Sequence, residues 1–124
     1  MVALALYDEL GEGFFIDLVD AFYVEVAADA LLRPMYPEDL SESRRHLQLF
    51  LIQYWGGPST YSDERGHPRL RMRHVPFTID DEARAAWLHA MRAAMATLAD
   101  SLSPEQAREL DDYFVMAART LRNA

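Results

Sequence analysis

Residues 54–77 read YWGGPSTYSDERGHPRLRMRHVPF, a stretch that glycine and proline divide into short pieces. A glycine pair followed by proline cannot continue a helix, so Gly56-Gly57-Pro58 is expected to end the helix before it. Residues 59–67 are predicted to be a polar connection. A short helix can begin at Pro68 and must stop before Pro76, which leaves it barely two turns.

Helical periodicity continues on both sides of this stretch, and no segment alternates as a strand would. Upstream, one helix is expected after Gly11-Glu12-Gly13 and another from Ser41. Downstream, one is expected from near Thr78 and the last behind the capping box Ser103-Pro104-Glu105-Gln106. The apolar residues at helical spacing are Phe15, Leu18, Val19, Phe22, Tyr23 and Val26; Leu47, Phe50, Leu51 and Tyr54; Trp87, Leu88, Met91, Met95 and Leu98; and Leu110, Tyr113, Phe114, Ala117 and Leu121.

A shorter helical turn is expected between the first two long helices. Asp29 can cap it and Pro34 ends it, and residues 35–39 then form a turn. Four substantial helices and two short ones must pack around one centre. The sequence therefore predicts an all-α protein with a single domain at residues 1–124.

The composition excludes several classes of protein. The 124 residues include no Cys, which excludes disulfide scaffolds, zinc sites built on thiolates and catalytic cysteines. All twelve basic side chains are Arg, so no mechanism can use a lysine nucleophile or Schiff base. A formal charge of −8 argues against nucleic acid as the main partner. No apolar run approaches the roughly 20 residues of a membrane span, and no signal peptide is evident, so we expect a cytoplasmic protein.

Basic residues are concentrated in one place in this acidic chain. Arg65, Arg69, Arg71 and Arg73 fall within nine residues and could form a local site for an anion. The alternative is an exposed face whose cations pair with neighbouring carboxylates at 63 and 64, each pair contributing little.

Three aromatic side chains with polar tips accompany the imidazole of His74, which the short helix between the prolines carries. Tyr23 and Trp87 lie within apolar stripes, and Tyr36 lies in the turn beyond Pro34. Each could donate to a nearby carbonyl, the common outcome for a buried Tyr or Trp. Together they suggest a shared acceptor instead, and a diatomic ligand on haem iron is one such acceptor.

Several runs of sequence resemble the group II truncated haemoglobins. They are Tyr54-Trp55-Gly56-Gly57-Pro58 with Tyr61-Ser62, then residues 65–74 and Pro76-Phe77, with residues 32–39 and Trp87-Leu88 at matching places. The resemblance extends from about Phe22 to the end of the last helix. It departs near the start, where the family tends to carry a glycine pair and this chain has Gly11-Glu12-Gly13 after an apolar segment from Val2 to Leu6.

The resemblance implies a shortened globin with two helices packed over two others around haem b. In that family the residue at the place of His74 is the proximal iron ligand, and those at Tyr23, Tyr36 and Trp87 form the distal hydrogen-bonding set. Ser43 would lie over the distal face, where it opens a polar route for ligands or leaves space. Leu47 would lie one turn further in.

The remaining contacts with haem are also expectations. The second ring nitrogen of His74 should donate to a carbonyl one turn back, that of Leu70. For the propionates Arg73 is the first candidate, with Arg71 and the Tyr61 phenol next. The apolar floor is assigned to Phe50, Leu51, Leu70, Phe77 and Met91. His46 and His89 flank their apolar stripes and are predicted to be surface groups, so the unliganded iron is five-coordinate.

Three functions are compatible with these residues. The first is reversible binding of O2, CO, NO and similar diatomic ligands, with an unidentified reductase keeping iron ferrous. The second is a haem enzyme, a peroxidase or nitric oxide dioxygenase, built on the same distal donors. The third is a helical interaction module without haem, in which His, Tyr and Trp are ordinary core residues. The sequence permits either a monomer or a homodimer.

Overall fold

The computed structural model describes residues 6–124, which form helices and no strand. The elements in chain order are α1 (Leu6–Ala28), the 3-10 helix η2 (Arg33–Met35), α2 (Ser41–Tyr54), α3 (Thr60–Arg65), α4 (Leu70–His74), α5 (Asp81–Thr97), the 3-10 helix η3 (Ala99–Ser101) and α6 (Pro104–Leu121). Val2–Ala5, most of the apolar start noted above, lie outside the described residues. Among residues 6–124 no helix combines the length and apolar character needed to cross a bilayer.

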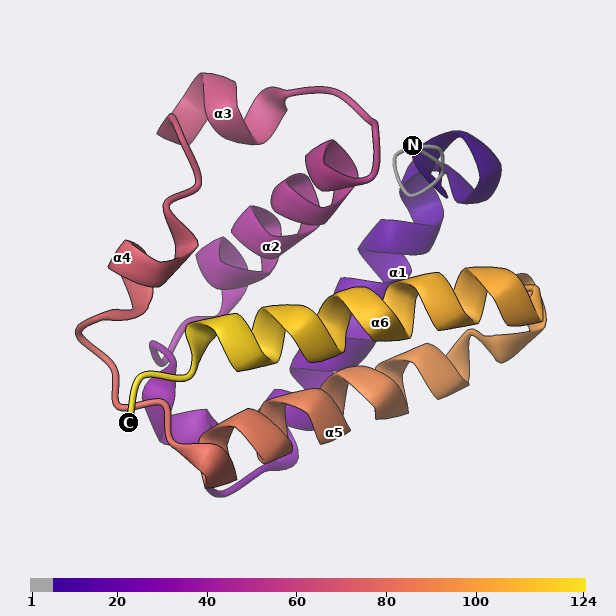
Figure 1. The fold of residues 1–124 in the computed structure, drawn as a ribbon. Helices are drawn as coiled ribbons and strands as arrows, with labels where there is room; N and C mark the ends of the chain where they lie inside the picture. The colour runs from indigo at the N-terminus through magenta and orange to yellow at the C-terminus, as the bar shows by residue number, and fades with distance from the viewer. Residues whose placement is uncertain (1–5) are drawn as a thin grey trace.

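Four long helices form two antiparallel pairs. α1 packs against α2, α5 packs against α6, and α1 also packs against α5 and so joins the pairs. The short helices α3 and α4 lie to one side, on the path that leads from the end of α2 to the start of α5 (Figure 1). This is the two-over-two globin arrangement, and the all-α prediction is confirmed.

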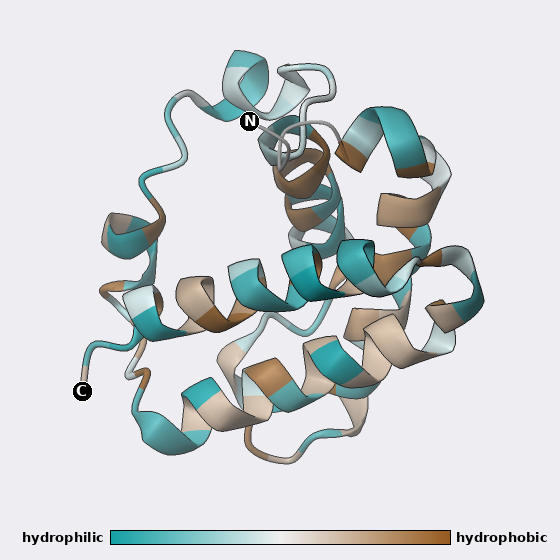
Figure 2. Cartoon of the chain, turned by 45° about the vertical axis from the view of Figure 1, so that its right-hand side comes forward, coloured by the Kyte–Doolittle hydropathy of each residue, from teal (hydrophilic) through white to brown (hydrophobic). Residues whose placement is uncertain are grey.

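The core lies where α1 meets the other long helices. Hydrophilic and hydrophobic residues are interleaved along each helix, as expected when one face is buried (Figure 2). Every apolar residue predicted for the α1 stripe is buried, and α5 and α6 contribute Met91, Leu110 and Phe114. The packed core fixes α1 and α5, the two helices that carry Tyr23 and Trp87.

The beginning of α1 differs from the prediction. The helix starts at Leu6, not after Gly13, and is interrupted at Gly11, where φ is 83°. A positive φ suits glycine because it has no Cβ. Tertiary contacts stabilise the early turn, since Leu6 is buried and the Tyr7 N–H donates to the carbonyl of Trp55 at 2.9 Å.

The prediction for residues 59–67 is wrong in part, because they contain the helix α3. The Gln53 side chain bonds to Ser62 twice, donating to its hydroxyl at 2.8 Å and accepting from its N–H at 3.0 Å. Tyr61 is buried, and its ring packs edge-on against Phe50 with centroids 5.6 Å apart. These contacts with α2 stabilise a helix that the local sequence does not favour.

The short helix α4 begins at Leu70, two residues later than predicted. The cause is Arg69, whose backbone is left-handed with φ 45° and ψ 51° and so cannot belong to the helix. Its end before Pro76 is as predicted. Pro34, expected to end a helical turn, instead lies in the first turn of η2, where the missing N–H costs no hydrogen bond.

The caps of the last two long helices explain where they begin. Asp80 caps α5 by accepting from the Ala83 N–H at 2.9 Å, so the helix starts at Asp81 and not near Thr78. Ser103 and Gln106 form the predicted capping box of α6.

Candidate functional site

A cavity of about 390 Å³ lies between α1, α2, α4 and α5. Its wall is mainly apolar, and it carries polar side chains from several helices, including Tyr23 of α1, His74 of α4 and Trp87 of α5. Ligand pockets typically range from about 300 to 1,000 Å³ and combine apolar walls with a few polar groups that orient the ligand. The cavity therefore suits a largely apolar molecule held at a few polar points.

His74 is the last residue of α4, and its imidazole lines this cavity. Its Nδ1 lies 2.6 Å from the carbonyl oxygen of Leu70, the bond expected one helical turn back. Because a carbonyl only accepts, Nδ1 carries the proton, and in the neutral ring Nε2 is then the nitrogen with the lone pair. Such a bond fixes both the tautomer and the ring orientation of a metal-ligating histidine.

The three aromatic donors share the same cavity. Tyr23 and Tyr36 pack edge to face, with ring centroids 5.7 Å apart and planes at 85°. Trp87 packs against Phe22 with ring centroids 5.7 Å apart, and Phe22 packs against Tyr23 at 5.1 Å. Ser43 and Leu47 of α2 also line the wall. The structure therefore brings together all four side chains that the resemblance assigns to the distal site.

Both phenols remain protonated over the physiological pH range. Burial raises the pKa of Tyr23, and the nearby phenol of Tyr36 adds to the effect. Burial also raises the pKa of Tyr36 to about 12, opposed by a hydrogen bond with the Trp87 side chain. These groups are hydrogen-bond donors and not bases.

The arginines predicted for an anion lie in different surroundings. Arg73 lines the cavity, but its guanidinium donates to the carbonyls of Pro68 at 2.7 Å and Arg65 at 3.1 Å, which ties α4 to the end of α3. Arg71 and Arg69 are exposed and lie outside the wall. Arg73 therefore has a structural task in addition to any contact with a ligand.

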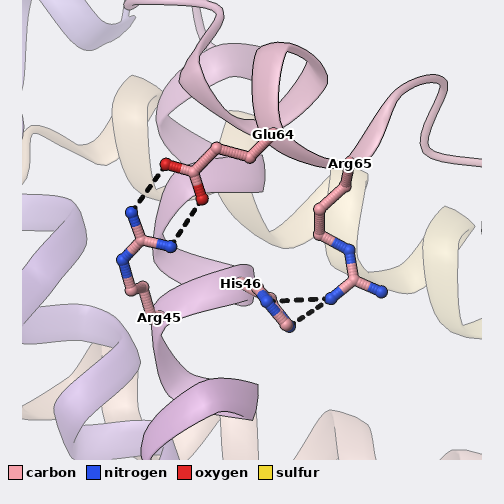
Figure 3. Close-up of polar contacts among 4 residues, drawn as sticks. All are labelled: Arg45, His46, Glu64 and Arg65. Carbon is pink, nitrogen blue, oxygen red and sulfur yellow. Dashed lines mark hydrogen bonds and ion pairs between the residues drawn. The ribbon is translucent and has the colours of Figure 1, made fainter.

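His46 was predicted to be a surface group, and this prediction is wrong because its side chain lines the cavity. The signal was available, since Ser43, His46, Leu47 and Phe50 follow the spacing of one helix face. His46 contacts the guanidinium of Arg65, which lies 2.8 Å from Nε2 and also contacts Nδ1 (Figure 3). A cation and an imidazole thus occupy the α2–α3 side of the cavity.

The charges around His46 favour its neutral form. Burial lowers its pKa, and the positive charges of Arg65 and Arg45 act in the same direction, against Glu42 and Glu64. Arg45 itself pairs with Glu64 through two hydrogen bonds of 2.6 and 2.8 Å, seen beside the His46 contact in Figure 3. Arg65 therefore approaches an uncharged ring.

The predicted apolar floor divides between the cavity and the core. Phe50, Leu70 and Phe77 line the cavity, as does Tyr61. Leu51 and Met91 do not, because their helix faces turn into the core, where both are almost fully buried. Sequence reasoning did not identify several other wall residues, which are Leu32, Met35, Pro37, Ile79, Ala83, Arg84, Ala118 and Leu121.

Comparisons with known proteins agree with this architecture. Residues 5–120 match the model of the family described as bacterial-like globin. The curated relative named group 2 truncated hemoglobin YjbI, from Bacillus subtilis, is 50% identical over 91 residues, which cover 73% of this chain and 69% of the relative.

Two solved structures superpose closely on the chain. A thermostable haemoglobin from Thermobifida fusca matches with a TM-score of 0.92 and 51% identity, over 95% of this chain and 96% of the other. A truncated oxygen-avid haemoglobin from Bacillus subtilis matches with a TM-score of 0.89 and 43% identity, over 94% and 98%. The chain belongs to the bacterial-like globin family and is a group II truncated haemoglobin.

Proposed function

We propose that this globin holds haem b in the cavity through His74 and reversibly binds O2 and other small diatomic ligands on the opposite side. One observation carries the proposal. The His74 imidazole, oriented by the carbonyl of Leu70, lines the same largely apolar cavity as three aromatic hydrogen-bond donors. Haem, when bound, would supply an iron that the His74 imidazole could ligate and that could take up a diatomic ligand.

The tautomer of His74 fits this role. A proton on Nδ1 leaves Nε2 as the nitrogen available to a metal, and neutral imidazole is a common metal ligand. A carbonyl that accepts from the far nitrogen raises the basicity of the ligating one. His74 thus presents to the cavity a nitrogen suited to ligating the iron.

The donors on the other side would stabilise a ligand that carries partial negative charge. Tyr23, Tyr36 and Trp87 can each donate one hydrogen bond, and the raised phenol pKa values keep the protons in place. A hydrogen bond to a charged acceptor contributes about 1.5–3 kcal/mol. Slow release of O2 follows, and a globin that releases O2 slowly is suited to sensing or scavenging and not to transport.

The carboxylates of haem would meet cations and a hydroxyl on the cavity wall. Arg73 and the buried Tyr61 remain candidates from the sequence, and Arg65 with His46 joins them from the structure. Arg65 has its Nη1 on an uncharged imidazole and no carboxylate partner of its own among the described residues, so its charge is available. Arg71, which is exposed, would contribute only through the long-range attraction of its positive charge.

Oxygen binding by the reduced, haem-loaded protein tests the proposal. We expect a stoichiometric ferrous complex that forms on mixing with O2 and releases it when flow dialysis or a competing ligand removes O2. Haem-loaded protein that oxidises at once on contact with O2, with no reversible complex, would contradict it. The similar truncated haemoglobin from Bacillus subtilis is described as oxygen-avid, and we propose the same property for this chain.

Peroxide chemistry is a second candidate because His46, which can accept and return a proton, lies on the cavity wall beside Arg65. Turnover of an electron donor with hydrogen peroxide should then fall in His46→Gln and remain in His89→Gln, where the exposed imidazole serves as the control. Equal turnover in both variants would leave ligand binding as the better account.

A further inference from the structure

The last residues of the chain, which follow α6, lie against the segment that follows α4. In Figure 1 the yellow end of the chain passes beside the loop that joins α4 to α5. There the N–H of Ile79 donates to Oδ1 of Asn123 at 2.8 Å, and Nδ2 of Asn123 donates to the carbonyls of Phe77 at 2.9 Å and His74 at 3.3 Å. The Asn123 backbone N–H adds a bond to the carbonyl of Ile79 at 2.9 Å.

The chemistry of this contact is specific to an amide. A main-chain N–H only donates and a carbonyl only accepts, so these three bonds use one acceptor and two donors of the same side chain. Asn supplies that set. Aspartate would keep the acceptor for Ile79 but place negative charge against the carbonyls of His74 and Phe77, and alanine would supply neither.

The helix α4 depends on such contacts from outside. It spans only Leu70–His74, follows a left-handed residue, has no side-chain cap and is soon followed by Pro76. An isolated helix of this length is unstable in water. The Arg73 side chain ties the helix to the segment before it by bonding to the carbonyls of Pro68 and Arg65, and the Asn123 amide bonds to the carbonyl of its last residue.

We propose that Asn123 is a positioning residue, which holds the carbonyl end of α4 and so sets the direction in which the His74 imidazole faces the cavity. The Leu70 carbonyl fixes how the imidazole is rotated about the bond that joins it to Cβ. Asn123 instead fixes the backbone that carries the His74 side chain. This inference rests on the proposed function, in which His74 ligates haem iron. It means that the orientation of His74 depends on a residue 49 positions further along the chain.

Resonance Raman spectra of the reduced, haem-loaded protein test the proposal through the iron–imidazole stretching band. Asn123→Ala and Asn123→Asp should both shift or broaden the band, and both should lose haem to an apo-globin acceptor roughly two- to tenfold faster, the range for one net hydrogen bond. Amide hydrogen exchange at Ile79, measured without haem, should accelerate in the alanine variant, which loses the acceptor.

Arg122→Ala is the matched control. It removes the ion pair of 2.9 Å between Arg122 and Asp81 beside the same loop but leaves the amide in place, so the band and the haem-loss rate should match wild type. A wild-type band that persists unchanged in both Asn123 variants overturns the inference alone. A wild-type protein with no iron–imidazole band overturns the proposed function and the inference together.

Discussion

The two sides of the cavity are built in different ways. Tyr23 and Trp87 project from α1 and α5, long helices of 23 and 17 residues that pack against each other in the core. His74 projects from α4, a helix of five residues held by side-chain bonds to neighbouring backbone. These two donors therefore inherit the rigidity of the core, whereas the position of His74 depends on a few hydrogen bonds to neighbouring segments.

The largest effect is expected on the α4 side of the cavity, where we expect loss of the His74 imidazole to change haem retention. Replacing His74 by Ala removes the proposed metal ligand, and haem retention should be lost or greatly weakened, as a haemin titration followed by absorbance would show. His89→Ala, an exposed position away from the cavity, should bind haemin as wild type does. Equal retention in the His74 variant would mean that another group holds the cofactor.

Substitutions in the core that supports Tyr23 and Trp87 should strongly lower the free energy of unfolding. Met91 is fully buried on α5, so Met91→Ala should lower the free energy of unfolding by about 2–5 kcal/mol, measured by urea denaturation. Met72→Ala provides the same change on α4, where the side chain is 61% exposed, and should stay within about 0.5 kcal/mol of wild type. Similar losses in the two variants would remove the contrast between the two sides.

The donors should govern how long O2 stays bound. Tyr23→Phe or Trp87→Phe removes a hydrogen bond of about 1.5–3 kcal/mol, so O2 dissociation should accelerate roughly ten- to a hundredfold in stopped-flow experiments. Tyr113→Phe changes a half-buried phenol outside the cavity wall and should leave the rate unchanged. Unchanged rates in both distal variants would exclude Tyr23 and Trp87 as stabilisers of the ligand.

The smallest effect concerns the pH dependence of stability at His46, which lines the cavity from α2. Its pKa is lowered in the folded protein, so the unfolded chain binds more protons as pH falls through the ordinary histidine value of about 6.5. Wild type should therefore lose stability relative to His46→Gln below that pH and not above it. Parallel stability curves from pH 8 to 5 would contradict the lowered pKa.

The same contrast explains what the sequence could predict. The stripe of α1, the capping box of α6 and the end of α2 at the glycine pair follow from local patterns, and all are present. The resemblance named the residues of the candidate site, and the structure brings most of them to one cavity, although their roles stay predictions.

What the sequence missed depends on contacts between distant residues. The helix α3 is stabilised by Gln53 and by packing of Tyr61, which no local pattern reveals. Leu51 and Met91 share helical stripes with cavity residues, and only the packing of the helices decides which members face the core. The bonds of Asn123 join segments 44 or more positions apart, beyond the reach of periodicity.

Absorption spectra of the purified, reduced protein with and without carbon monoxide test the central claim most directly. If His74 holds haem with the opposite side open, an intense Soret band should be present and should shift when carbon monoxide is added. A helical, folded protein that shows no Soret band after incubation with haemin, or a band that carbon monoxide leaves unchanged, would contradict the account.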